Sequence, residues 1–403
     1  MLDDGHVTSA AGWRVATAAC EIKYTGRDDL ALLVSDLPCT SAAIFTTNKV
    51  KAAPVRYDLA LMQRSAGILR GLVVNAGNAN ACTGPDGDAA ASAMARAVES
   101  QLGLDADTVF VMSTGTIGVP MPVAKIVAGI ERAAETLSPA NGIAAARAIM
   151  TTDTRPKHLA LRLTLPSGTP VTLGGMAKGA GMIHPNMATL LAIVTSDVAI
   201  APNVLDAALR RAADLSFNSI SIDGDTSTND TLLLMCNGIA GNSPIDELES
   251  ADGAAFLAAL TQLCRSLAQE VVRDGEGATR FVTISVRGAR SHADAKLAAM
   301  TIAKSPLVKT ALHGADPNWG RVLCALGYSG AELDPERVVL HFGGMKVLED
   351  GLPLSFDEAA ASDILNLAEV AIDADLGLSS GEATVWTCDF SAEYVRINAE
   401  YRT

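Results

Sequence analysis

Apolar residues follow two different periods along this chain of 403 residues. Short runs rich in Val, Ile, Leu and Thr are typical of strands, whereas alanine-rich stretches with an apolar residue every three or four positions are typical of helices. The predicted strands cover residues 30–35, 42–46, 72–75, 109–113, 159–165, 191–196, 281–286, 338–342 and 383–390. The predicted helices cover residues 88–103, 123–137, 202–215, 253–273, 293–312 and 359–376.

The order of these elements predicts an α/β protein in which helices cover sheets. Several strands follow one another without a helix between them, which favours mixed or antiparallel sheets over a regular barrel or a doubly wound sheet. The last residues, 397–403, alternate like a further strand. The one candidate boundary is a glycine-rich run that ends before Thr189.

Composition narrows the classes of function. The formal net charge of −14 disfavours a nucleic-acid partner, because phosphates would be repelled by most of the surface. Seven dispersed cysteines form no CxxC pair, so we expect neither a disulfide framework nor a zinc site, and a reducing cytoplasm is the expected location. The acidic start of the chain is unlike a secretory signal, and no apolar run is long enough to predict a membrane span.

The most informative segment is the glycine-rich stretch from Lys178 to Thr189, which an apolar run follows at once. This layout suits a backbone bond held under strain beside a hydroxyl. Cleavage between Ala188 and Thr189 would make Thr189 a new N-terminus that carries both a nucleophile and its own base, because a free α-amine has a pKa near 8. We therefore predict two fragments, residues 1–188 and 189–403.

Three further features are candidates for parts of a site. Thr114 and Gly115 follow a predicted strand and could form an oxyanion hole, although an ordinary strand-to-helix turn has the same pattern. Glu276 lies between two glycines, where it is placed to reach a cation, and Lys178 could bind a carboxylate. His184 is expected to form a structural hydrogen bond, since the new α-amine makes a histidine base unnecessary.

Two polar turns are expected to be structural. The asparagines of residues 75–84 should bond local backbone, because the segment lacks the ending of a phosphate loop. Residues 223–230 resemble a calcium loop only at first, because position 12, Leu234, cannot supply the bidentate glutamate that such a loop needs. A buried polar turn that supports the site is the better interpretation.

Taken in order, these segments resemble the bifunctional glutamate N-acetyltransferase/ornithine acetyltransferase family of arginine biosynthesis. The resemblance covers nearly the whole chain. It lies in residues 42–54, 75–84, 113–118, 150–154, 178–189, 221–230, 274–279 and 314–321.

The resemblance implies self-cleavage before Thr189 and transfer of an acetyl group from N-acetylornithine to glutamate through an acetyl-Thr189 ester, with no metal or organic cofactor. It implies an oxyanion hole at Thr114 and Gly115. Substrate contacts are implied at Thr151 (or the adjacent Thr152), Lys178, Thr189, Glu276, Asn398 and Thr403.

The implied fold is a layered αββα sandwich built jointly by both fragments, which assemble into a heterotetramer of two alpha and two beta chains. Because the bifunctional form is common in the family, acetyl-CoA is expected as a second acetyl donor. The alternative enzyme class is an N-terminal-nucleophile aminopeptidase or amidase, which gives the acyl group to water. A non-catalytic binding protein with a glycine-rich hinge is a third reading.

Overall fold

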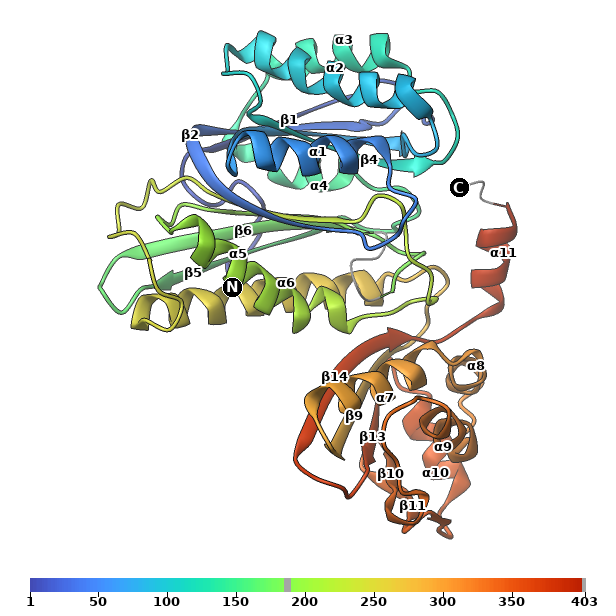
Figure 1. Cartoon of the computed structure of the whole chain (residues 1–403). Coiled ribbons are helices and arrows are strands. Elements are labelled where there is room, and N and C mark those ends of the chain that lie inside the picture. Colours follow the sequence, from blue (N-terminus) through green and yellow to red (C-terminus); the bar gives the residue numbers. More distant parts are fainter. Residues whose placement is uncertain (185–189, 401–403) are drawn as a thin grey trace.

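The computed structural model describes residues 1–184 and 190–400, which form a large lobe and a smaller C-terminal lobe (Figure 1). The large lobe contains one sheet of eight strands, in the order β4-β3-β2-β8-β7-β6-β5, with β1 paired to β2. The strands are β1 (Trp13–Ala18), β2 (Leu30–Phe45), β3 (Ile68–Asn78), β4 (Val109–Thr116), β5 (Lys157–Thr164), β6 (Pro170–Lys178), β7 (Leu191–Ser196) and β8 (Thr231–Cys236). The β3–β4 and β7–β8 pairs are parallel and the others antiparallel, so the sheet is mixed as predicted.

The long strand β2 divides this sheet into two halves. Its first part pairs with β1 and β3, and its last part, Thr40–Phe45, pairs with β8. A buried core that includes Leu33, Leu72, Ile193 and Leu233 lies between the halves. The two halves therefore stack face to face.

Helices cover the outer face of each half. The pair α2 (Gly84–Leu102) and α3 (Val123–Ala134) packs on the first half, and the pair α5 (Pro202–Asp214) and α6 (Ala251–Arg273) packs on the second, at opposite ends of the large lobe in Figure 1. The predicted layered αββα sandwich is confirmed. The remaining elements of this lobe are α1 (Ala53–Arg64), η1 (Pro139–Asn141), α4 (Gly142–Ala148) and η2 (Phe217–Ser219).

The C-terminal lobe has a core of its own that the sequence did not predict as a separate unit. Its six-stranded sheet has the order β12-β11-β10-β13-β9-β14, with β9 and β13 parallel. Its strands are β9 (Phe281–Ala289), β10 (Val339–Phe342), β11 (Met345–Glu349), β12 (Leu352–Pro353), β13 (Glu369–Asp375) and β14 (Gly381–Cys388). Its helical elements are α7 (His292–Lys304), α8 (Pro306–His313), α9 (Trp319–Gly327), η3 (Pro335–Arg337) and α10 (Glu358–Leu365).

Four of the predictions differ from the structure. The two strands expected over 30–35 and 42–46 are one continuous strand, β2. The helix expected over 359–376 ends at Leu365, and the rest becomes β13, because its apolar residues alternate and pair with β9. The helix expected over 293–312 is two helices, since Pro306 begins a new one capped by Ser305. The strand expected at 397–403 is wrong for the described part, where α11 (Ala392–Glu400) is a helix with Arg396 paired to both Glu393 and Glu400.

Within the described residues, no helix combines the length and the apolar character that crossing a membrane requires.

Candidate active site

A cavity opens where several strands of the large lobe end and α11 passes over them. The residues that line it come from segments far apart in the sequence: Ala79, Thr114, Gly115, Ile117, Thr151, Thr152, Lys178, Gly181, Met182, Asp223, Asp225, Ser227, Thr228, Asn229, Glu276, Tyr394 and Asn398. Six residues predicted from the sequence are therefore brought together, namely Thr114, Gly115, Thr151, Lys178, Glu276 and Asn398. Ala188, Thr189 and Thr403 lie outside the described residues.

Thr114 and Gly115 are held at the end of β4 by its parallel pairing with β3. Gly77 and Gly115 are partners in this pairing, and the two backbones approach closely: a Cβ on Gly115 would lie 2.2 Å from the carbonyl carbon of Gly77. Gly115 also has a φ of 133°, which residues with a side chain rarely adopt. The position therefore requires glycine, for both space and backbone angle.

Lys178 is the buried cation of the cavity. It ends β6, and its Nζ donates hydrogen bonds to the hydroxyls of Thr151, at 2.7 Å, and Thr114, at 3.2 Å. Burial lowers the pKa of the Lys178 ammonium, an effect that the negative charge of Asp153 opposes. An ammonium bonded to two neutral hydroxyls can still attract an anionic group of a ligand. Thr151 and Thr152 both line the cavity, and Thr151 is the one bonded to Lys178.

A buried ion cluster fixes the loops around Lys178. The ammonium of Lys157 lies 2.6 Å from a carboxylate oxygen of Asp153 and 2.6 Å from one of Asp274, and the side chains are almost wholly buried. Asp153 also accepts hydrogen bonds from the backbone N–H groups of Gly179, at 2.7 Å, and Thr151, at 2.9 Å. The cluster thus joins the Thr151 loop, the end of β6 and the loop that leads to Glu276.

Glu276 and Asn398 meet across the cavity. The Asn398 side-chain amide donates a hydrogen bond of 2.7 Å to the Glu276 carboxylate, and the Glu276 N–H bonds to the carbonyl of Ala180. This hydrogen bond joins helix α11 to the loop after α6, and these two segments together form one wall of the cavity. The sequence analysis expected Glu276 to reach a cation and Asn398 to contact a substrate, but it did not predict the hydrogen bond between the two side chains.

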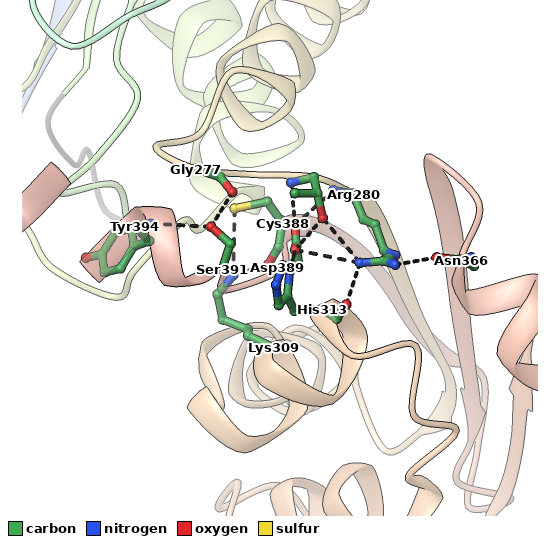
Figure 2. A network of polar contacts seen from close by, with 10 residues as sticks. Gly277, Arg280, Lys309, His313, Asn366, Cys388, Asp389, Ser391 and Tyr394 are labelled. Atoms are coloured by element: carbon green, nitrogen blue, oxygen red, sulfur yellow. Dashed lines mark hydrogen bonds and ion pairs between the residues drawn. The ribbon is translucent and has the colours of Figure 1, made fainter. Parts of the chain in front are cut away.

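The C-terminal lobe anchors this wall through a polar network (Figure 2). The buried carboxylate of Asp389 accepts hydrogen bonds from Thr279, the Arg280 N–H and His313. The Ser391 hydroxyl donates to the carbonyl of Gly277, one residue from Glu276. The loop that carries Glu276 and the start of α11 are in this way tied to the same part of the second lobe.

Residues 223–230, predicted to be a polar turn that supports the site, form the remaining side of the cavity. The Asp223 carboxylate accepts hydrogen bonds from the N–H groups of Met182 and Ile183, at 2.5 and 2.9 Å, and from the hydroxyl of Tyr394, at 3.3 Å. The Asn229 amide donates to the carbonyls of Ala79 and Ser113 at 2.6 and 2.8 Å.

The structural roles predicted for the asparagines of residues 75–84 and for His184 agree with their hydrogen bonds. The Asn75 amide donates to the Asn78 carbonyl, and the Asn80 amide to that of Gly87, so the asparagines of that turn bond local backbone. His184 lies 3.3 Å from the Ser221 hydroxyl and does not line the cavity. Burial lowers the pKa of His184 to about 4, which the nearby Lys304 reinforces, so the imidazole is neutral at pH 7.

Sequence reasoning missed Asp153, Lys157 and Tyr394 as parts of the site. Asp153 and Lys157 lie four residues apart, and this spacing is a weak sequence indication of a salt bridge. The sequence does not show that the two side chains are buried, because their burial depends on the tertiary packing. Among the described residues, no three His, Cys, Asp or Glu side chains are grouped as a metal site would require.

The fold and the cavity define an α/β enzyme with a buried lysine, a carboxylate and a strand-end Thr-Gly pair around one site. The ArgJ family model matches residues 14–403. The chain is 50% identical to the arginine biosynthesis bifunctional protein ArgJ of Symbiobacterium thermophilum, over 99% of both chains, and 49% identical to that of Geobacter sulfurreducens, over 97% of this chain and 99% of the relative.

Among solved structures, the bifunctional protein argJ from Bacillus halodurans is 41% identical with a TM-score of 0.50, and the match covers 51% of this chain and 97% of that one. The chain belongs to the ArgJ family and is an acyltransferase enzyme of arginine biosynthesis.

Proposed function

We propose that this enzyme transfers the acetyl group of N-acetylornithine to glutamate, through an ester on Thr189 that becomes the N-terminal residue when the chain cleaves itself after Ala188. The observation that carries the proposal is the convergence of Thr114, Gly115, Lys178, Glu276 and Asn398 on one cavity. These residues supply the groups that acetyl transfer between two amino acids needs: hydrogen-bond donors, a buried cation and a buried carboxylate.

In the first half-reaction, the Thr189 hydroxyl oxygen attacks the acetamide carbonyl, and its proton passes to the residue's own α-amine. The Thr114 hydroxyl and the Gly115 N–H donate hydrogen bonds to the oxyanion. The carbon–nitrogen bond then breaks, and ornithine leaves with the proton. In the second half-reaction, the amine of glutamate attacks the ester carbonyl and gives up a proton to the α-amine of Thr189. The bond to the Thr189 oxygen then breaks, and that oxygen takes the proton back from the α-amine.

Charge in the cavity orients the substrates. Lys178 binds the α-carboxylate that both amino acids share, while Glu276, held by Asn398, and the carboxylate of Thr403 attract the side-chain ammonium of ornithine. Thr151 supports Lys178 through the 2.7 Å hydrogen bond. Acetyl-CoA serves as a second acetyl donor to Thr189, which gives the enzyme its N-acetylglutamate synthase activity.

Cleavage divides the chain into an alpha fragment, 1–188, and a beta fragment, 189–403, which assemble as a heterotetramer of two of each. The match to the solved chain from Bacillus halodurans supports this division, because nearly all of that chain corresponds to about half of this one. The sandwich also needs both fragments, since β6 belongs to the first and its neighbour β7 to the second.

Two measurements test the proposal. Denaturing electrophoresis of the purified enzyme should show two bands of similar size, and Thr189→Ala should leave one band of 41.6 kDa. Incubation with N-acetylornithine should yield N-acetylglutamate only when glutamate is present. An intact wild-type chain with full activity would refute the cleavage, and release of free acetate in place of N-acetylglutamate would identify an amidase.

A further inference from the structure

Helix α11 brings two neutral hydrogen-bond donors, Tyr394 and Asn398, to the lining of the cavity. They lie four residues apart, so their side chains project from the same side of the helix. The Tyr394 hydroxyl donates to the carboxylate of Asp223 at 3.3 Å. The Asn398 amide donates to the carboxylate of Glu276 at 2.7 Å. Two carboxylates of the cavity are therefore each bonded to a donor from one helix.

The two donors differ in how firmly they are held. The Asn398 amide nitrogen uses both of its hydrogens, because it also donates to the carbonyl of Tyr394 at 3.0 Å. The Asp223 carboxylate, in contrast, accepts three further hydrogen bonds from backbone N–H groups, at 2.5, 2.9 and 3.2 Å. The bond from Tyr394 is the longest of the four, and it exceeds the distance of about 2.7–2.8 Å that is usual for a hydroxyl donor. Asp223 thus keeps good partners if the Tyr394 hydroxyl turns away.

The two substrates of the proposed function carry opposite charges at the same place. Ornithine has its side-chain nitrogen on Cδ, and glutamate has its side-chain carboxylate oxygens on Cδ, so both terminal groups reach the same wall when the shared head binds Lys178. Glu276 suits the ammonium and repels the carboxylate. Among the described residues that line the cavity, Lys178 is the only basic one, and the α-carboxylate occupies it. The side chain of glutamate therefore needs a neutral donor on this wall.

We propose that Tyr394 is a specificity-determining residue, whose hydroxyl turns from Asp223 to the side-chain carboxylate of glutamate. This inference rests on the proposed function and deepens it, because it assigns different residues to the two substrates. Glu276, held by Asn398, binds the ammonium of N-acetylornithine, and Tyr394 binds the carboxylate of glutamate. A hydroxyl rotates about its own C–O bond, so neither the ring nor the helix has to move.

The surroundings of Tyr394 suit this role. Its ring stacks on Phe390, with the ring centroids 4.7 Å apart and the planes at 19°, so the hydroxyl is presented from a fixed position. Burial raises the pKa of Asp223, although its backbone hydrogen bonds oppose this effect. A carboxyl that binds a proton more readily than usual, and whose charge is offset by N–H groups, repels an incoming carboxylate less.

The test is Tyr394→Phe, which removes the hydroxyl and keeps the stacked ring. No residue of α11 is buried, so we expect the melting temperature to stay near that of the wild type. Because the donor and the acceptor react in separate half-reactions, kcat/KM for each substrate reports its own step. We expect kcat/KM for glutamate to fall about 10-fold, as for loss of a hydrogen bond to a charged group, and kcat/KM for N-acetylornithine to change less than about twofold.

Two variants bracket this result. Tyr328→Phe is the matched control, because Tyr328 is 63% exposed and does not line the cavity, and it should retain both wild-type values. Asn398→Ala should show the reverse pattern, with the loss confined to N-acetylornithine.

Two outcomes would overturn the inference. An equal loss for both substrates in Tyr394→Phe would mean that the hydroxyl only supports the cavity wall through Asp223, and unchanged kinetics would mean that it binds neither substrate. A wild type that makes no N-acetylglutamate from N-acetylornithine and glutamate would refute the proposed function, whereas an active wild type matched by Tyr394→Phe would refute the role of Tyr394 alone.

Discussion

The side-chain amide of Asn398 donates a hydrogen bond of 2.7 Å to the carboxylate of Glu276, which lies 122 residues earlier in the chain. The bond holds a carboxylate in place at the edge of the cavity while leaving its negative charge available. It also depends on α11, which the second lobe ties to the Glu276 loop through the hydrogen bond from Ser391 to Gly277.

Loss of this amide should weaken substrate binding. In Asn398→Ala the Glu276 carboxylate loses a charge-assisted hydrogen bond, worth about 1.5–3 kcal/mol, so we expect KM for N-acetylornithine to rise about 10-fold with little change in kcat. Steady-state kinetics measure this. Asn366→Ala is the control, because Asn366 bonds to Arg280 and does not line the cavity. Equal KM values in the two variants would contradict the role of Asn398.

The hydroxyl of Thr114 should contribute to kcat. Removal of one oxyanion donor typically lowers kcat by a factor on the order of 100 to 1,000, and we expect such a loss in Thr114→Val and partial recovery in Thr114→Ser, which keeps the hydroxyl. Thr116→Val is the matched control, since Thr116 is buried two residues further along β4 but does not line the cavity. A Thr114→Val enzyme as active as Thr116→Val would exclude an oxyanion role.

Local patterns predicted most of the first lobe, and they failed where two patterns overlap. Residues 369–375 combine alanines with alternating apolar positions, and only pairing with β9 decides that Val370, Ile372 and Ala374 face a core as a strand. The Ser305-Pro306 break was visible as a proline, yet the periodicity continued across it.

In the candidate site too, the sequence predicted the residues with a distinctive local pattern and missed those whose role depends on tertiary packing. Lys178, Glu276 and the Thr114–Gly115 pair stood out because of their glycine-rich surroundings, which are local. Asp153 and Lys157 did not, because a salt bridge is recognised as buried only after β5, β6 and the Asp274 loop are packed together. Asn398 reaches the site because it belongs to helix α11, whereas the sequence predicted a strand over residues 397–403.

The buried ion cluster should be a major source of stability. Lys157→Met removes the cation and leaves two buried carboxylates, which should lower the free energy of unfolding by about 3–5 kcal/mol at pH 7. Lys346→Met removes a lysine from an exposed pair with Glu349 and should cost less than about 1 kcal/mol. Urea denaturation followed by circular dichroism compares them, and similar losses in both would refute the buried cluster's contribution.

The same ion cluster should make the free energy of unfolding depend on pH in the acidic range. Although burial opposes it, the positive charges of Lys178 and Lys157 hold the pKa of Asp153 below its usual value. A lowered carboxyl pKa gives stability that is present above the unfolded pKa of about 4 and is lost as the pH falls further. The difference in the free energy of unfolding between wild type and Lys157→Met should therefore become smaller below about pH 4. A constant difference down to pH 2.5 would show that Asp153 is not the titrating group.

His184 should add a second pH dependence of stability, at a less acidic pH than that of Asp153. Its folded pKa of about 4, set first by burial and then by Lys304, is below the unfolded value of about 6.5, so the unfolded chain binds the proton more readily. Stability should then fall as the pH decreases from about 6.5 towards 4. His184→Gln should reduce this slope without abolishing it, since burial also lowers the pKa of His6. Melting temperatures between pH 7.5 and 4.5 measure the slope, with the exposed His292→Gln as control. If His184→Gln and His292→Gln keep the same slope as wild type, His184 is not buried in its neutral form.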